Sequence, residues 1–266
     1  MAAAPPPPPP QSDEEDEEGL GAIGFMFDGE TRKSWVTHQP SPSVTVEVQC
    51  IDEDGPGALI SGQYLWPAAS FLAAFLARHW GSGGHPTLQE LPARTRVLEL
   101  GAGCGLVGLT VAQMEGCAAV TMTDHDPGTL RLIEAGVARN AGRLCAECRA
   151  VLLEWGEDDA VGKALGGDGR GEGGFDLVIG SDLIYSDTVV PPLLATVAGV
   201  LLDSRSKGAT GARFLLCGSF ALGETILAEV ERVCAELKLA RSFVSLEGEG
   251  ASETMWMECV TLLASA

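Results

Sequence analysis

The 266-residue sequence predicts an α/β protein built on a doubly wound, mainly parallel seven-stranded sheet that ends in an antiparallel hairpin. Three observations support this fold. From about residue 95, short apolar segments alternate with amphipathic segments of helical length, which is typical of parallel strands covered by helices on both faces. A glycine-rich turn, Gly101–Gly105, follows the first of these apolar segments. The last two apolar segments have no helix between them, so they are expected to pair antiparallel.

The N-terminal segment, residues 1–30, is expected to be a disordered tail. It combines a proline run, Pro5–Pro10, with an acidic run, Asp13–Glu18, and such low-complexity composition does not form a packed core. Residues 31–266 are assigned to one folded domain of ordinary globular size.

A small β-hairpin is predicted in front of the main sheet. Apolar residues alternate along Trp35–Cys50 and again along Ala58–Trp66. Between them, Asp54–Gly57 contains the glycine and proline residues that are typical of a turn.

The remaining elements follow in order from the spacing of apolar residues. Helices are expected at Pro67–Trp80, Gly105–Met114, Leu130–Asn140, Pro192–Leu202 and Glu224–Leu237. Strands are expected at Arg96–Leu100, Ala119–Thr123, Ala150–Leu153, Phe175–Gly180, Arg213–Gly218, Ser242–Leu246 and Met255–Leu263. The glycine- and acid-rich segment Gly156–Gly174 is expected to be a surface loop with room for one short turn of helix.

The acidic composition, with a net charge of −20, limits the partners. Phosphates would be repelled, so no nucleic acid is expected to bind, and basic partners are favoured. No apolar run approaches the roughly 20 residues that cross a bilayer, and the N-terminus lacks the features of a secretory signal. We therefore expect a cytoplasmic protein with no membrane partner, and the nucleus is the alternative location. Nothing in the sequence bears on the oligomeric state.

The eight cysteines are expected to be reduced thiols, since no secretory signal precedes them. Cys145 and Cys148 have the spacing of two zinc ligands. A zinc site needs two more ligands, and the sequence has no second pair with such spacing. No metal site is therefore predicted.

The glycine turn admits two kinds of cofactor. Gly103–Gly108 matches the dinucleotide-binding pattern G-x-G-x-x-G, and Asp124 ends the second expected strand, where an acid binds ribose hydroxyls. Taken alone, these residues favour an NAD-dependent oxidoreductase.

Three other features favour a different cofactor, S-adenosylmethionine. Glu99 precedes the glycines, where a carboxylate suits a ligand ammonium or an ordered water better than a pyrophosphate. Asp182 and Tyr185 follow the fourth strand, near the point where the strand order reverses. The terminal hairpin also departs from the dinucleotide-binding arrangement. S-adenosylmethionine has an ammonium, a carboxylate, a sulfonium and a ribose but no phosphate.

The sequence resembles the seven-strand, Rossmann-like S-adenosylmethionine-dependent methyltransferases. Within them it is most similar to the family-16 methyltransferase-like proteins, which are mostly protein-lysine methyltransferases. Four motifs within residues 40–263 carry the resemblance: Gly62–Pro67, Val97–Gly108, Leu153–Gly156 and Ser181–Tyr185.

The resemblance implies a cofactor-binding set: Trp66, Glu99, Gly101, Gly103, Asp124, Trp155 and Ser181. Glu99 and the glycines would surround the methionine end, Asp124 would bind the ribose, and the two tryptophans would cover the cofactor. Structural alternatives remain open. Asp124 would otherwise cap a helix, Trp155 would be a core residue, and Trp66 would anchor the helix that follows it.

The resemblance further implies that Asp182 and Tyr185 act as catalytic residues. Asp182 would orient the acceptor ammonium or hold the sulfonium end, and Tyr185 would line the lysine channel through a cation–π contact. The alternatives are a helix cap for Asp182 and core packing for Tyr185. Phe220 is a further candidate for a substrate contact.

The predicted enzyme is an S-adenosylmethionine-dependent protein N-methyltransferase that acts on lysine. Its partner would be a protein with a basic or lysine-bearing surface. The alternatives are methylation of arginine, histidine or a small molecule, an NAD-dependent oxidoreductase, and a non-catalytic interaction module that retains a relict cofactor pocket.

Overall fold

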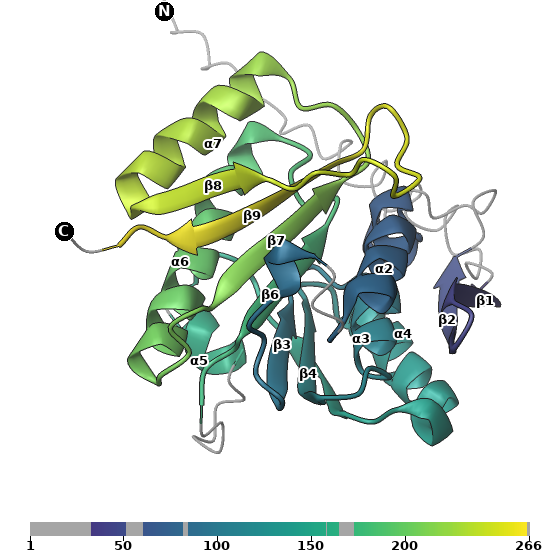
Figure 1. Ribbon diagram of the computed structural model, residues 1–266. Coiled ribbons are helices and arrows are strands. Elements are labelled where there is room, and N and C mark those ends of the chain that lie inside the picture. The colour runs from purple at the N-terminus through teal and green to yellow at the C-terminus, as the bar shows by residue number, and fades with distance from the viewer. Residues whose placement is uncertain (1–32, 52–60, 82–84, 158, 165–172, 265–266) are drawn as a thin grey trace, which may run out of the picture.

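The computed structural model describes residues 33–51, 61–81, 85–157, 159–164 and 173–264 and contains a seven-stranded sheet. The strands are β3 (Thr95–Glu99), β4 (Cys117–Asp124), β5 (Glu147–Leu152), β6 (Leu177–Ser181), β7 (Arg213–Gly218), β8 (Leu239–Phe243) and β9 (Trp256–Leu262). Their order is β5-β4-β3-β6-β7-β9-β8. The first five in this order are parallel, and β9 runs antiparallel to both of its neighbours (Figure 1). The predicted fold class and terminal hairpin are confirmed.

Helices cover both faces of this sheet (Figure 1). One face carries α2 (Pro67–His79), α3 (Leu106–Val111) and α4 (Pro127–Asn140), and the other carries α5 (Ala160–Ala164), α6 (Val190–Ser206) and α7 (Glu224–Leu237). Short 3-10 helices lie at η1 (Ser61–Gln63), η2 (Pro86–Leu88), η3 (Ala141–Arg143) and η4 (Asp187–Val189).

Strand β6, at the centre of the sheet, is mostly apolar because both of its faces are buried. In β6, Leu177 and Ile179 join the core beneath α2 and α3, while Val178 joins the core beneath α6 and α7. Successive side chains of a strand point to opposite faces, so one continuous apolar run supplies both cores.

The predicted small N-terminal hairpin is present, but its strands lie at other residues than expected. Its strands are β1 (Lys33–Ser41) and β2 (Val44–Ile51), which form a separate two-stranded sheet. The segment predicted as one strand therefore folds back on itself at Pro42 and Ser43. Proline fixes its own φ and has no N–H to donate, so the Pro-Ser-Pro-Ser run at residues 40–43 ends the strand and forms the turn. The second strand was predicted at Ala58–Trp66. In the described part of that segment, Ser61–Gln63 is helical rather than extended, so this prediction was wrong.

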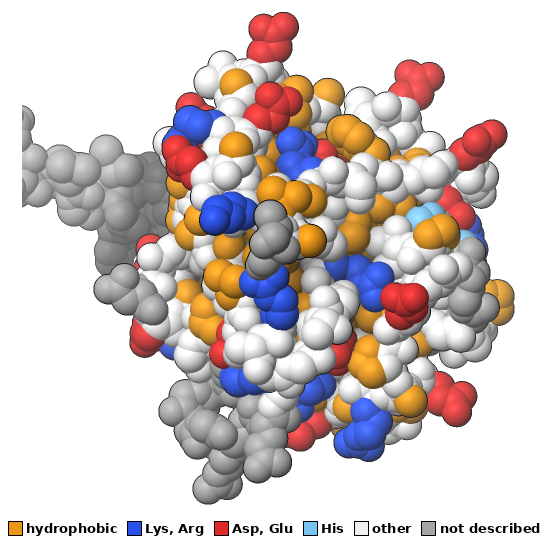
Figure 2. Space-filling model, turned by 60° about the vertical axis from the view of Figure 1, so that its left-hand side comes forward, with side chains coloured by type: hydrophobic (Ala, Val, Ile, Leu, Met, Phe, Trp, Pro, Cys, Tyr) orange, Lys and Arg blue, Asp and Glu red, His pale blue; other side chains and the backbone are white. Residues whose placement is uncertain are grey.

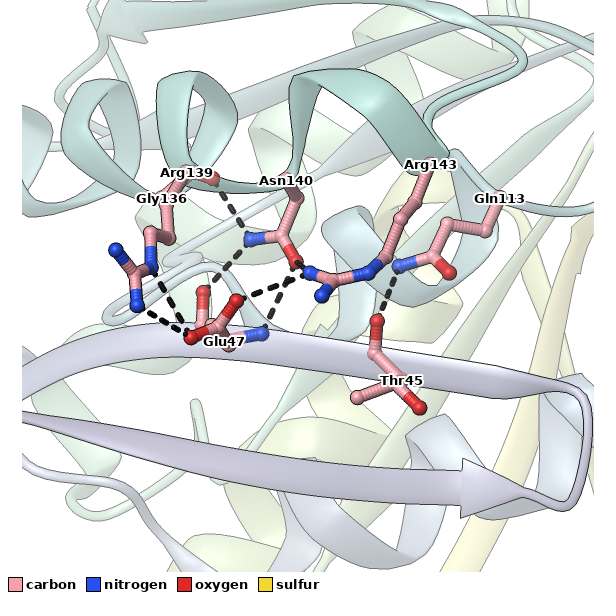
Figure 3. A network of polar contacts seen from close by, with 7 residues as sticks. All are labelled: Thr45, Glu47, Gln113, Gly136, Arg139, Asn140 and Arg143. Atoms are coloured by element: carbon pink, nitrogen blue, oxygen red, sulfur yellow. Dashed lines mark hydrogen bonds and ion pairs between the residues drawn. The ribbon is translucent and has the colours of Figure 1, made fainter.

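The hairpin is attached by polar contacts to α4, to η3 and to Gln113, which follows α3 (Figure 3). Glu47 accepts hydrogen bonds from Arg139 and Arg143 at 2.9–3.0 Å. The buried Asn140 side chain accepts from the Glu47 N–H at 3.0 Å and donates to its carbonyl at 2.7 Å. Gln113 donates to the carbonyl of Thr45 at 2.9 Å. Val44, Val46 and Val48 are also buried in the same apolar cluster as residues of α2 and α3, so the hairpin packs against these helices.

The segment Asp187–Ser206 corrects the expectation that no apolar run approaches the length of a membrane span. It is helical over 20 residues with a mean hydropathy of 1.3, so by length and composition alone it would suit a membrane span. Half of it is buried inside the protein, and Leu193, Val197 and Leu201 belong to the core. Figure 2 shows the side of the molecule that carries α5, α6 and α7. Hydrophobic side chains lie among charged ones on this surface and do not form one continuous apolar area.

The predicted disordered tail, residues 1–30, lies outside the described residues. So does Asp54–Gly57, which was predicted as the hairpin turn.

Candidate functional site

A pocket of about 360 Å³ opens at the carboxyl ends of the parallel strands. It is lined by Gly62, Tyr64, Leu65, Trp66, Ala69, Gly101, Ala102, Gly103, Cys104, Leu106, Asp124, His125, Glu154, Trp155, Ser181, Asp182, Leu183, Tyr185, Pro192 and Phe220. All the predicted site residues except Glu99 are in this set, together with the weaker candidate Phe220. The pocket also lies where ligands bind in open α/β sheets.

The glycine turn after β3 forms the floor of this pocket. Gly101 and Gly103 have φ angles of 55° and 54°, in the left-handed region that favours glycine. A Cβ on Gly101 would lie 2.6 Å from a methyl of Leu183 and 3.1 Å from the Trp155 ring. A Cβ on Gly103 would lie 3.0 Å from the carbonyl oxygen of Gly62. A larger residue at either position would therefore strain the backbone and crowd these neighbouring atoms.

Glu99 lies behind the turn rather than in the pocket. Its side chain is 2% exposed, and its Oε2 accepts a hydrogen bond from the N–H of Gly108 at 2.9 Å. Burial raises the pKa of this carboxyl to about 8, with a further contribution from the charge of Asp124. The expectation that Glu99 faces a ligand ammonium does not match this placement. Its carboxyl group accepts from the first turn of α3 and helps to hold it.

Asp124 links the turn to the end of β4. Its Oδ2 accepts from the N–H of Gly103 at 3.1 Å, and its Oδ1 accepts from the N–H of Asp126 at 3.1 Å. The helix cap considered for Asp124 is instead made by Asp126, whose side chain accepts from the backbone N–H groups of Gly128 and Thr129. Asp124 thus lines the pocket and also fixes the turn.

Gln63 is a residue that the sequence analysis missed. Its side chain donates to Asp126 at 3.1 Å, and its carbonyl accepts from the Cys104 thiol at 3.3 Å. These contacts hold the segment before α2 against the glycine turn. The signal was present, since Gln63 belongs to the motif Gly62–Pro67 that was singled out for its tryptophan alone.

Asp182 has both carboxylate oxygens bonded within the chain. Oδ1 accepts from the Ser219 N–H at 2.7 Å, and Oδ2 accepts from the Ser219 hydroxyl at 2.8 Å and from the Ala68 N–H at 3.2 Å. Trp66 occupies the N-cap position of α2 and makes no side-chain cap. Asp182, which directly follows β6, therefore supplies this cap, and its carboxylate also opposes the positive end of the helix. The cap considered for Asp182 is real, but it belongs to α2 rather than to the helix near Pro192.

Aromatic side chains surround the mouth of the pocket. Trp66 is 44% exposed and Tyr185 is 61% exposed, and the exposure of Tyr185 excludes the core-packing alternative. Trp155 is partly buried against the core and lies close to Gly101 at the pocket. It therefore has features of both alternatives, a core residue and a residue that lines the cofactor site. The Trp256 indole donates to the carbonyl of Phe220 at 2.8 Å and fixes that backbone at the rim.

The pocket is acidic. Its charged lining residues are Asp124, Glu154 and Asp182, and no lysine or arginine lines it in the described part of the chain. A pyrophosphate would therefore lack a basic partner here, whereas a ligand with an ammonium or a sulfonium would be attracted. In the same described ranges, no three His, Cys, Asp or Glu side chains are grouped so as to hold a metal ion.

The lysine methyltransferase family matches residues 49–210 of this chain. The chain is 37% identical over 160 residues to the protein N-lysine methyltransferase METTL21A of Danio rerio, a match that covers 57% of this chain and 64% of that protein. It is 30% identical over 161 residues to the protein-lysine N-methyltransferase EFM3 of Saccharomyces cerevisiae, covering 56% of this chain and 43% of that one. The matches thus span less than two thirds of these relatives' lengths.

A solved structure shares the fold at low sequence identity. It is a candidate methyltransferase in complex with SAH, with a TM-score of 0.52 and 12% identity, covering 82% of this chain and 54% of that one.

Proposed function

Because the chain belongs to the lysine methyltransferase family, we propose that it transfers a methyl group from S-adenosylmethionine to a lysine of a protein substrate. The observation that carries this proposal is the pocket itself. Four segments that lie far apart in the sequence bring Trp66, Asp124, Trp155 and Tyr185 to one cavity at the end of the parallel strands.

The residues present fit S-adenosylmethionine. Left-handed glycines let a ligand approach the main chain closely, and the acidic lining suits positive charge. We assign Asp124 to the ribose hydroxyls and Trp155 to the adenine, while Gly101, Gly103 and Ser181 lie against the rest of the molecule. When bound, this cofactor supplies a methyl group on a positively charged sulfur.

The aromatic mouth is assigned to the acceptor. Trp66, Tyr185 and Phe220 would enclose the lysine stem, and their ring faces attract an ammonium. An amine attacks only when neutral, whereas the ordinary pKa of lysine is about 10.4. Excluding water from the ammonium favours the neutral form, so burial within the enclosure assists deprotonation, whereas the cation–π attraction of the rings opposes it.

Asp182 is assigned a positioning role in this scheme. Its two oxygens already accept hydrogen bonds from Ala68 and Ser219. Direct orientation of the acceptor would compete with these bonds. By capping α2, Asp182 fixes the helix start beside Trp66 and the strand end beside Phe220, which are the two sides of the proposed lysine entry.

The proposed substrate is a protein with a basic or lysine-bearing surface. The net charge of −20 favours encounter with such a partner. A related mouse protein, 36% identical over 107 residues, is named for lysine methylation of EEF1A.

The test is titration of the purified protein with S-adenosylmethionine by calorimetry, followed by incubation of a cell lysate with labelled cofactor. We expect saturable binding and label on lysine of one or a few proteins, located by mass spectrometry. Absence of binding at millimolar cofactor would overturn the proposal. Label on arginine, histidine or a small molecule would overturn the acceptor assignment alone. Thermal protection by NAD instead of S-adenosylmethionine would support an oxidoreductase.

A further inference from the structure

The last strand of the sheet reaches the rim of the pocket because it runs antiparallel. Strands β3 to β7 are parallel, and their carboxyl ends lie at the pocket. β9 pairs antiparallel with β7, so Trp256, its first residue, lies opposite Gly218, the last residue of β7. The start of β9 therefore lies at the same edge of the sheet as the pocket.

Two side chains at this end of β9 hold the segment that follows β7. The hydroxyl of Thr254 donates to the carbonyl of Ser219 at 2.7 Å, and the indole of Trp256 donates to the carbonyl of Phe220 at 2.8 Å. A Cβ on Gly218 would lie 2.3 Å from the indole, so the ring packs directly against this glycine. Two consecutive main-chain carbonyls are thus bonded to the terminal hairpin.

The same segment is held from its other side by Asp182. This carboxylate accepts from the N–H of Ser219 at 2.7 Å and from its hydroxyl at 2.8 Å. Connecting segments are usually more mobile than the strands they join, whereas here the main chain is bonded on both sides. Phe220 lines the pocket, so its place there depends on the contacts with Thr254 and Trp256.

The position of β7 in the sheet indicates which part of the pocket these contacts serve. The parallel strands lie in the order β5-β4-β3-β6-β7. Trp155 and Asp124, assigned to the adenine and the ribose, come from the β5 and β4 side. Tyr185 and Phe220 follow β6 and β7, on the other side of β3. The segment held by β9 therefore lies on the side of the pocket assigned to the acceptor.

We propose that Thr254 and Trp256 are positioning residues for the acceptor lysine. By fixing the carbonyls of Ser219 and Phe220, they keep Phe220 in place where the lysine side chain enters. A shift of this main chain would misplace the acceptor relative to the methyl group, and small misplacements slow such reactions strongly. This inference rests on the proposed function and extends it to the terminal hairpin.

The test compares methyl transfer with cofactor binding in Trp256→Phe and Thr254→Val, each of which removes one donor. The probe is S-adenosylmethionine labelled in its methyl group, with a cell lysate as the source of acceptor lysines. The initial rate of transfer is expected to fall about tenfold in Trp256→Phe. It is expected to fall about threefold in Thr254→Val, because Thr254 is exposed and water can replace its hydroxyl as a donor. Thr254→Ser keeps the hydroxyl and is expected to restore transfer.

Cofactor binding separates positioning from general damage to the fold. The affinity of both variants for S-adenosylhomocysteine, measured by calorimetry, is expected to stay within about twofold of wild type, with unchanged stoichiometry. Unchanged stoichiometry shows that all of the variant protein is folded. Hydrogen exchange is expected to be faster in residues 220–223, which follow the released carbonyls.

Trp80→Phe is the matched control. The Trp80 indole donates to the carbonyl of Glu115 at 3.1 Å, just before β4 and therefore at the edge of the sheet opposite the pocket. This variant loses the same kind of bond and is expected to transfer methyl groups at the wild-type rate.

Three results would overturn the inference: transfer at the wild-type rate in Trp256→Phe or Thr254→Val, an equal loss of transfer in Trp80→Phe, or a loss of cofactor affinity as large as the loss of transfer. Failure of the proposed function has a different sign, because wild type itself would then label no lysine.

Discussion

At the scale of single residues, Asp182 is the clearest case in which the structure changes the role expected from the sequence. The sequence placed an acid near the acceptor, which suggested direct contact with an ammonium. The structure engages both of its oxygens with Ser219 and with the start of α2. Its φ of 53° is also in the left-handed region, which is uncommon for a residue other than glycine.

We therefore predict that Asp182→Ala lowers stability and cofactor affinity together. The loss of a cap and of the bonds to Ser219 should cost roughly 2–4 kcal/mol of unfolding free energy. Urea unfolding and calorimetry measure the two effects. Asp187→Ala, which changes an exposed acid on η4, is the control and should alter neither. Loss of methyl transfer with unchanged stability in Asp182→Ala would restore a direct catalytic role.

Glu99 yields a prediction about pH. Its folded pKa of about 8 exceeds the ordinary value of 4.5, so the folded state holds a proton that the unfolded state has lost. The stability from this group is complete below about pH 4.5 and is lost as pH rises toward 8.

Glu99→Gln should remove this pH dependence, because an amide can accept from Gly108 at every pH. We expect the stability of wild type to fall relative to this variant between pH 5 and pH 8, by a few kcal/mol at most. Urea unfolding at the two values measures the difference. Glu115→Gln, at an exposed position, serves as the control. Parallel profiles for wild type and Glu99→Gln would show that Glu99 is ionised throughout.

At the scale of elements, the N-terminal hairpin depends on one buried amide. Asn140 at the end of α4 bonds both main-chain groups of Glu47 and also donates to the carbonyl of Gly136. Arg139 and Arg143 reach the same glutamate from more exposed positions.

We predict that Asn140→Ala costs roughly 2–4 kcal/mol of unfolding free energy, because it removes a buried amide and its bonds to partly buried main-chain groups of β2. Arg143→Ala should cost less than about 1 kcal/mol, since a solvent-exposed ion pair is weak. Hydrogen exchange should show faster exchange in β2 for the Asn140 variant. Equal losses for the two variants would mean that charge, rather than the amide, holds the hairpin.

The elements that the sequence predicted correctly are those whose signal is local. The parallel strands, α2 and α7 could be placed within a few residues, because their apolar periodicity is complete within each segment. The turn at Pro42 was missed because alternation continues on both sides of it and hides the change of direction. The bond between Asp182 and Ala68 joins residues 114 positions apart, so no local pattern could reveal it.

At the scale of the whole molecule, cofactor binding should raise thermal stability. A ligand at 100 times its Kd adds about 2.7 kcal/mol to the folded state. For a chain of this size, that corresponds to an increase in Tm of roughly 5–10 °C. Scanning calorimetry with S-adenosylhomocysteine measures the shift, and NAD at the same concentration is the control. Equal shifts for both, or none, would contradict the assignment of the pocket.

The position of β9 in the sheet has a consequence for the order of folding during synthesis. This strand follows β7 and β8 along the chain, yet it lies between them in space. Until β9 leaves the ribosome, β7 has an unpaired edge and β8 has no neighbour in the sheet. Open edges of this kind recruit other chains. The nascent protein therefore passes through a stage in which most of the sheet can form but its far side is open to aggregation, and this stage ends only when β9 has left the ribosome.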